Sequence, residues 1–196
     1  MSAIAIIPAR GGSTRLPGKN KRDFEGAPII GRSIITALAS GLFDQVFVST
    51  DDPDIAEIAM HYDAVAMYRP KADCENAVGT QWVIGNCVAT LNIQSPTLVC
   101  GIYPCAPLMI EDDLQRAHRI LIEQGYFRFA MSVGGEPLRD AGAFYFGRAE
   151  AFTAKEALIT SRTAMVFIPE VRVCDINTQK DWDMAVQKYR AIKTEK

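Results

Sequence analysis

The sequence contains few of the residues from which metal and disulfide sites are built. Of its 196 residues only two are histidines, His61 and His118, and neither lies near a pair of cysteines. The cysteines are odd in number and contain no Cys-x-x-Cys pair: Cys74, Cys87, Cys100, Cys105 and Cys174. This pattern argues against a zinc site and a disulfide scaffold. It is typical of reduced, mostly buried thiols in a cytoplasmic protein.

Two further absences narrow the range of partners. The net charge is −2, so the chain lacks the basic excess of a nucleic-acid-binding protein. No apolar run approaches the length of a membrane span, and no signal-like segment precedes the first apolar run. We therefore expect a cytoplasmic protein that binds neither nucleic acid nor membranes. A hydrophobic content of 48% and a charged content of 22% are typical of one globular domain.

The two common phosphate-binding signatures are also missing. A Walker loop counted from Gly12 would need Gly-Lys one residue earlier than it occurs, and Asn20 stands where a hydroxyl residue is required. Ser13 follows Gly12 where the dinucleotide fingerprint that begins at Gly11 requires a second glycine. A dinucleotide-dependent oxidoreductase is therefore disfavoured.

A different glycine-rich loop is present near the start of the chain. Residues 4–7 form an apolar run that predicts a buried strand, and Pro8 ends it. The loop that follows contains three glycines and three cations: Gly11, Gly12, Gly18, Arg10, Arg15 and Lys19. Glycines let the backbone approach a ligand, and N–H groups with cations suit a polyphosphate. The alternative is a solvated surface turn whose charges bind nothing.

Strands and helices are expected to alternate along most of the chain. Strands are predicted over 4–7, 46–49, 64–68, 98–102, 129–133, 143–146, 165–168 and 171–174. Helices are predicted over 29–39, 80–91, 110–123 and 149–155, from Pro53 with Asp52 as its cap, and after Thr178. This order predicts a single-domain α/β protein: a mostly parallel twisted sheet with helices on both faces.

A parallel sheet would gather the loops that follow its strands along one edge, where open α/β sheets bind ligands. The loops in question are 8–20, 49–52, 69–80, 102–107 and 175–177. Their convergence predicts one site that combines the cationic loop with Asp175.

Several of these segments resemble one enzyme family. Ile-Pro-Ala-Arg-Gly-Gly-Ser at 7–13, followed by Arg15, Pro17, Lys19 and Asn20, resembles the opening of the acylneuraminate cytidylyltransferases, the CMP-sialic acid synthetase family. The later matching segments are Arg69-Pro70, Gly79-Thr80, Tyr103-Pro104-Cys105-Ala106-Pro107, Asp140 to Gly147, Cys174 to Thr178, and Asp181-Trp182. The segments at 103–107 and 140–147 are most similar to the CMP-pseudaminic acid synthetase branch.

The resemblance implies a Rossmann-like nucleotide-diphospho-sugar transferase fold over residues 1–196 and a set of roles. Members transfer CMP from CTP to an acidic nine-carbon sugar, a nonulosonic acid, and release pyrophosphate; the resemblance also implies a homodimer. The catalytic residues would be Arg10, Lys19 and Asp175, with Asp175 holding Mg²⁺. The nucleotide would contact Ala9, Arg10, Gly11, Gly12, Ser13, Arg15, Lys19, Asn20, Arg69, Thr80, Tyr103 and Pro104, and the sugar would contact Asp51, Asp140 and Asn177.

The chain departs from the family pattern at three places. Thr14 stands where the family usually has lysine, and Asn177 replaces the second aspartate of its Asp-Ile-Asp segment. The region around 133–140 is shorter than in relatives, either genuinely or because a piece is missing from the sequence. These departures leave open a second hypothesis, a catalytically weak or inactive nucleotide-binding homologue.

Simpler structural readings of the candidate residues also stay open. Asp51 and Asp52 could cap a helix, and Asp140 and Asp175 could stabilise local turns. Cys105 has no histidine near it in the sequence, which favours an inert thiol over a nucleophile.

Overall fold

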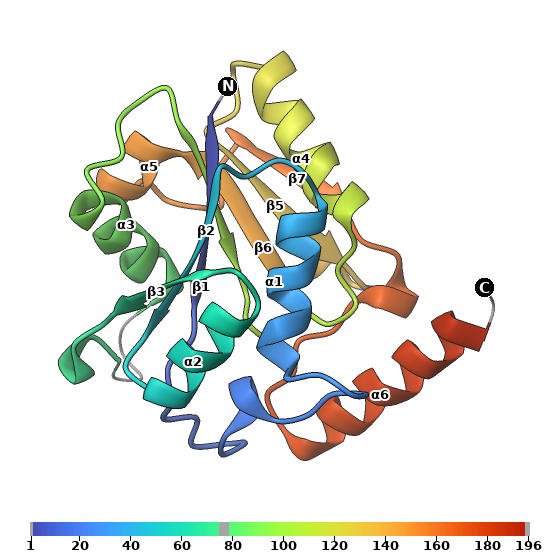
Figure 1. The fold of residues 1–196 in the computed structure, drawn as a ribbon. Helices are drawn as coiled ribbons and strands as arrows, with labels where there is room; N and C mark the ends of the chain where they lie inside the picture. Colours follow the sequence, from blue (N-terminus) through green and yellow to red (C-terminus); the bar gives the residue numbers. More distant parts are fainter. Residues whose placement is uncertain (1, 75–78, 195–196) are drawn as a thin grey trace.

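The sheet at the centre of the molecule confirms the predicted α/β fold (Figure 1). A computed structural model describes residues 2–74 and 79–194. In this part of the chain the sheet has the strand order β3-β2-β1-β4-β6-β5-β7. The strands are β1 (Ala3–Pro8), β2 (Gln45–Thr50), β3 (Val65–Tyr68), β4 (Leu98–Ile102), β5 (Phe129–Gly134), β6 (Arg139–Arg148) and β7 (Thr163–Phe167).

One strand runs against the others. β1 pairs in parallel with β2 and β4, β2 with β3, and β5 with β7. β6 lies between β4 and β5 and is antiparallel to both. The carboxyl ends of the other strands and the amino end of β6 therefore meet at one edge. β6 also extends well beyond the predicted residues 143–146, because its first half pairs with the end of β5.

Helices cover both faces of the sheet (Figure 1). On one face lie α1 (Ile29–Ala39), α2 (Pro53–His61) and α4 (Glu111–Glu123); on the other lie α3 (Thr80–Thr90) and α5 (Ala149–Thr153). Side chains of β1 alternate between the faces: Ala5 and Ile7 join the first core, whereas Ile4 and Ile6 join the second. This period of two is the pattern of a strand buried on both sides.

The predicted helix caps are present. The Asp52 carboxylate accepts hydrogen bonds from the backbone N–H groups of Asp54, at 2.9 Å, and Ile55, at 3.4 Å. Thr178 precedes α6 (Gln179–Thr194), and its hydroxyl accepts from the Asp181 N–H while Asp181 accepts from the Thr178 N–H. This reciprocal pair fixes where the last helix begins.

The predicted strand over 171–174 is wrong. Its first residues belong to the 3₁₀ turn η3 (Glu170–Arg172), in which the backbone N–H groups of Arg172 and Val173 bond back to Pro169 and Glu170. These local bonds use the groups that a sheet ladder would need. Two other turns of the same type are η1 (Lys19–Lys21) and η2 (Lys71–Cys74). Residues 75–78 of the predicted 69–80 connection lie outside the described part.

A separate apolar cluster attaches α6 to the N-terminal loop. Phe24 meets Trp182 and Tyr189 edge to face, with ring centroids 5.4 and 5.5 Å apart. Leu16 and Ile176 are buried in the same cluster. Figure 1 shows α6 running beside the loop that follows β1. The cluster thus holds the two ends of the chain together at the edge where the strands end. Among the described residues, no helix combines the length and hydropathy that a membrane crossing needs.

Gly85 allows a close approach of α3 and α5, which gives a test of this packing. A Cβ atom at Gly85 would lie 2.6 Å from the backbone oxygen of Phe152, and backbone cannot rotate away. We expect Gly85→Ala to lower the free energy of unfolding by about 1–3 kcal/mol in urea titrations, despite the better helix propensity of alanine. Gly125→Ala, which meets nothing within 4 Å, is the matched control. A Gly85→Ala protein as stable as wild type would contradict the close contact.

Candidate active site

A cleft lies at the edge of the sheet where β1 and β4 end. The predicted residues that line it come from four separate loops: Arg10, Ser13, Arg15, Lys19, Asn20, Arg69, Thr80, Tyr103, Pro104, Asp175 and Asn177. The topology therefore brings together segments that are far apart in the sequence. Their roles toward a ligand remain predictions. The predicted residues Ala9, Gly11, Gly12, Asp51 and Asp140 are not among the lining residues.

Asp51 supports the glycine loop from behind. Its carboxylate accepts the Gly11 N–H at 2.9 Å. Burial alone would raise the pKa of Asp51, but hydrogen bonds from the Gly11 N–H and from its own N–H lower it below the usual value. One oxygen of the Asp51 carboxylate therefore supports the loop backbone, and the contact of Asp51 with the sugar stays a prediction.

Gly11 lies so close to Asp52 that no side chain fits there. A Cβ atom at Gly11 would be 2.6 Å from the Asp52 carboxylate. Asp52 caps α2 and also pairs with Lys21 at 3.0 Å. The loop after β1 is therefore held against the amino end of α2 by Gly11, Asp51 and Lys21.

Asn20 and Cys105 fix the path of the cationic loop. The Asn20 amide donates to the Arg10 carbonyl at 2.9 Å, and its oxygen accepts from the Cys105 thiol at 3.1 Å. Burial raises the pKa of Cys105 to about 12, which agrees with the prediction of an inert thiol. The Asn20 side chain is thus largely engaged in holding the loop. The Arg10 guanidinium is directed across the cleft and donates to the Cys74 carbonyl at 3.0 Å.

The loop after β1 is tied directly to the segment before α6. Lys19 donates to the Ile176 carbonyl at 2.6 Å, and Arg15 donates to the Asn177 side-chain oxygen at 2.7 Å. The Asn177 amide in turn donates to the Asp175 carboxylate at 2.8 Å. The cations of the loop and the carboxylate of Asp175 are therefore neighbours in one cleft, as the sequence predicted.

Arg69 is the most unusual polar residue in the cleft. It is only 7% exposed, and its Nε has no hydrogen-bond partner among the described residues. A buried guanidinium group that is left unsatisfied is costly, unless an anion or another acceptor completes it. Because Arg69 lines the cleft, its Nε is placed to donate to an acceptor that enters the cleft.

Gly142 is a lining residue that sequence reasoning did not assign to the site. Its φ of +66° places it in the left-handed region, and a Cβ atom there would be 3.0 Å from that of Asp175. Asp140 produces this turn by accepting the Gly142 N–H at 2.8 Å. The turn-forming reading of Asp140 is therefore correct. Asp140 is not among the residues that line the cleft, and its contact with the sugar stays a prediction. The signal in the sequence that could have identified this position was the glycine, because it is the residue that favours a left-handed backbone conformation.

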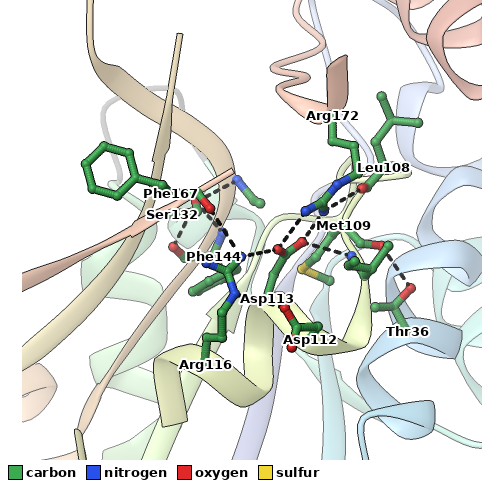
Figure 2. A network of polar contacts seen from close by, with 12 residues as sticks. Thr36, Leu108, Met109, Asp112, Asp113, Arg116, Ser132, Phe144, Phe167 and Arg172 are labelled. Carbon is green, nitrogen blue, oxygen red and sulfur yellow. Dashed lines mark hydrogen bonds and ion pairs between the residues drawn. The ribbon is translucent and has the colours of Figure 1, made fainter. Parts of the chain in front are cut away.

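A buried ion-pair network anchors the chain just before Asp175 (Figure 2). The Asp113 side chain of α4 is fully buried and pairs with Arg116 at 2.6 Å and with Arg172, whose Nη2 lies 2.9 Å away. Arg172 also donates to the Leu108 carbonyl. The network connects the amino end of α4 to η3, and so fixes the start of the segment that carries Asp175.

The described residues contain no group of three or more histidine, cysteine, aspartate or glutamate side chains arranged for a metal ion. Within this part of the chain the carboxylates lining the cleft are Asp73 and Asp175. Mg²⁺ is commonly held by one or two carboxylates together with substrate phosphates. The donor set at Asp175 therefore fits a metal that binds with a nucleotide.

Comparison with known proteins decides the family. A sequence model described as cytidylyltransferase matches residues 4–166. The chain is also 33% identical to the pseudaminic acid cytidylyltransferase of Campylobacter jejuni subsp. jejuni over an alignment that covers 97% of each chain. The chain belongs to the cytidylyltransferase family. The sequence-based assignment of the family is thereby confirmed.

This cytidylyltransferase is also similar to proteins with which it shares lower sequence identity. It is 27% identical to N-acylneuraminate cytidylyltransferase A of Danio rerio, covering 94% of this chain and 50% of the relative. Among solved structures, CMP:2-keto-3-deoxy-manno-octonic acid synthetase complexed with CTP matches with a TM-score of 0.76 over 100% of this chain and 99% of that chain, at 15% identity. That similarity supports the predicted nucleotidyltransferase fold.

The ion-pair network before Asp175 can be tested through stability. Asp113→Asn leaves two guanidinium groups without their shared charge partner, so the free energy of unfolding should fall by about 3 kcal/mol. Asp112→Asn is the matched control, because Asp112 pairs with Arg116 at the surface and should contribute at most about 1 kcal/mol. Urea titration measures both. Equal effects of the two substitutions would refute a special role for the buried network.

Proposed function

We propose that this cytidylyltransferase transfers CMP from CTP to a nonulosonic acid and releases pyrophosphate. The observation that carries the proposal is the buried guanidinium of Arg69, which shares one cleft with Arg10, Lys19 and Asp175. Such a cleft suits a ligand with several negative charges. The choice of a nonulosonic acid draws on the relatives, which are named for pseudaminic and N-acylneuraminic acids.

The chemistry requires charge stabilisation at the triphosphate. A hydroxyl oxygen of the sugar acid attacks the α-phosphorus and forms a new P–O bond, and its proton passes to water. The bond from that phosphorus to the bridging oxygen breaks. The electron pair leaves with pyrophosphate, whose charge increases. Arg10, Arg15 and Lys19 would bind the phosphates and stabilise that charge, and Ser13 and Gly12 would supply short donors beside them.

Asp175 would hold Mg²⁺ together with oxygens of the nucleotide, and the ion would supply further positive charge at the phosphates. Arg15 and Asn177 would keep the Asp175 carboxylate oriented toward the cleft through the hydrogen bonds described above. Arg69 and Tyr103 would lie farther from the reacting phosphorus and bind the remaining parts of the substrates.

Three wider properties belong to the same proposal. The protein would act in the cytoplasm, which agrees with five free cysteines. It would form a homodimer; Met165 and Phe167, 49% and 59% exposed on the edge strand β7, supply apolar surface near the region of 133–140. The chain would be one nucleotidyltransferase domain with a shortened 133–140 segment. In support, the alignment with the Campylobacter relative spans 225 positions, more than the 196 residues of this chain.

Pyrophosphate release tests the reaction. The purified protein is incubated with Mg²⁺, CTP and one sugar acid at a time: pseudaminic acid, a sialic acid or 3-deoxy-manno-octulosonate. We expect release with CTP and a nonulosonic acid, and none with UTP or without Mg²⁺. A protein that binds CTP but turns over none of these acids would overturn the proposed reaction and favour the alternative below.

The alternative is a nucleotide-binding homologue with little activity. Asn177 favours it, because an amide lies beside Asp175 at the position where the resemblance to the family implies a second carboxylate. If metal affinity limits the reaction, Asn177→Asp should lower the Mg²⁺ concentration for half-maximal pyrophosphate release several-fold, since a second carboxylate adds a ligand. Thr14→Lys, which adds a cation at the phosphates, is the comparison variant. A gain with neither substitution would remove the support for the alternative.

Arg69 should decide nucleotide affinity. Replacing a buried charged donor by Arg69→Gln removes a charge-assisted interaction, so CTP affinity measured by calorimetry should fall about ten- to a hundredfold. Arg119→Gln is the control, because Arg119 is exposed on α4 and does not line the cleft. If Arg69→Gln binds CTP as wild type does, the guanidinium does not contact the nucleotide.

A further inference from the structure

Three side chains form a hydrogen-bonded chain that begins in the cleft and ends behind it. Tyr103, which lines the cleft, has its hydroxyl oxygen 3.1 Å from that of Tyr145. The Tyr145 hydroxyl donates to the Asp140 carboxylate. The pairing of β4 with β6 places Gly101 opposite Tyr145, which sets Tyr103 and Tyr145 beside each other with ring centroids 5.6 Å apart.

The Asp140 carboxylate sets the direction in which the three side chains donate their hydrogen bonds. An ionised carboxylate has no proton to give, so it can only accept. One Asp140 oxygen accepts the Gly142 N–H and the other accepts from Tyr145. Tyr145 has a single proton and uses it on Asp140. Its oxygen must therefore accept the proton of Tyr103, which leaves Tyr103 with lone pairs and no free proton.

Burial keeps both tyrosines in the protonated form that this direction requires. Tyr145 is 8% exposed. Burial, followed by the nearby Tyr103 and Asp140, raises the pKa of Tyr145, and burial raises the pKa of Tyr103. Thr80 also lines the cleft, and its side chain is among the groups that act to lower the pKa of Tyr103 against the larger effect of burial. The Thr80 hydroxyl can rotate between donating and accepting. Tyr103 can become a donor to the cleft only if Tyr145 and Asp140 also reverse their hydrogen bonds.

We propose that Asp140 and Tyr145 make the Tyr103 oxygen an obligatory hydrogen-bond acceptor, so that the cleft selects a substrate group that carries an N–H or O–H donor at this point. Asp140 and Tyr145 are positioning residues, and Tyr103 is the residue that contacts the substrate. This inference rests on the proposed function for the identity of the substrates. Two groups supply the chemistry: the exocyclic amine of cytosine, or a hydroxyl or amide N–H of the sugar acid.

Asp140→Asn reverses the direction of donation along the hydrogen-bonded chain and preserves the turn at Gly142. The asparagine oxygen can still accept the Gly142 N–H, but its amide now donates to Tyr145. Tyr145 then donates to Tyr103, which turns its proton toward the cleft and meets the substrate donor with another donor. We expect at least about a tenfold loss of affinity for the substrate that lies there, because the bond is lost and the donors conflict.

Two binding experiments distinguish the sources of the donor. CTP and UTP are titrated separately by calorimetry; a fall in the CTP:UTP affinity ratio in Asp140→Asn identifies the cytosine amine. Pseudaminic acid is titrated into protein saturated with CMP, which has no leaving group. If Asp140→Asn lowers the affinity for pseudaminic acid and leaves the CTP:UTP affinity ratio unchanged, the donor belongs to the sugar. Neither arm needs turnover, so failure of the proposed reaction is seen separately, as absence of pyrophosphate release by wild type.

Tyr145→Phe provides the decisive control, because it removes the hydroxyl that connects Asp140 to Tyr103. We expect Tyr145→Phe to weaken discrimination, since Tyr103 is then free to donate or accept. Adding Asp140→Asn to Tyr145→Phe should cause no further change in either arm. Circular dichroism checks that each variant is folded.

The proposal is overturned by either of two results. One is an Asp140→Asn effect of the same size with and without the Tyr145 hydroxyl, which would mean that Asp140 acts through the Gly142 turn. The other is a change of less than about twofold in all three affinities for folded Asp140→Asn. If Asp140→Asn does not fold, an unchanged CTP:UTP ratio and sugar affinity in Tyr145→Phe overturn it alone.

Discussion

The site depends on the hydrogen bond from Lys19 to the carbonyl of Ile176, which joins segments 157 residues apart in the sequence. A charged donor on a backbone carbonyl is stronger than a neutral pair, and it fixes the backbone as well as the side chain. A parallel sheet brings the cationic loop and the Asp175 segment to the same edge. It does not by itself fix the position of one segment relative to the other. The contact of Lys19, with that of Arg15 to Asn177, sets their relative position.

Each partner in that contact is held independently. The loop is fixed from behind by Asp51 at the Gly11 N–H, and the other segment is fixed by Arg172 on the buried Asp113. Apolar contacts of Phe24 with Trp182 close the arrangement from the outside. The cations in the cleft are therefore preorganised, which matters because charges that need not move during a reaction stabilise its transition state most effectively.

The sequence predicted those features that arise from local chemistry or from periodic burial. The limits of α1 and the Asp52 cap of α2 followed from apolar spacing and capping preferences. The convergence of Arg10, Lys19 and Asp175 followed from topology, because strand ends in a parallel sheet share an edge.

What depended on contacts between distant side chains could not be predicted. For Asp51 and Asp140 the sequence left both a ligand contact and a local structural role open, because each carboxylate could bind a ligand or a nearby backbone N–H; the fold shows the backbone contacts. The strand predicted over 171–174 failed for a similar reason: its β-branched residues fit a strand, but Arg172 is held by Asp113 and the backbone turns instead. Neither the sequence around Tyr103 nor the sequence around Tyr145 indicates that the two hydroxyl groups are hydrogen-bonded.

The reversal of β6 has a consequence for how such a protein can diversify. Because β6 begins at the edge where the other strands end, the short connection between Gly134 and Arg139 lies near the segment that carries Asp175, and Arg139 and Asp175 line the same hollow. Residues added there would lie at this end of the sheet and would not shift the register of any strand. The surface beside the cleft can therefore change within one hairpin, while the loops after β1 and β4 keep their geometry.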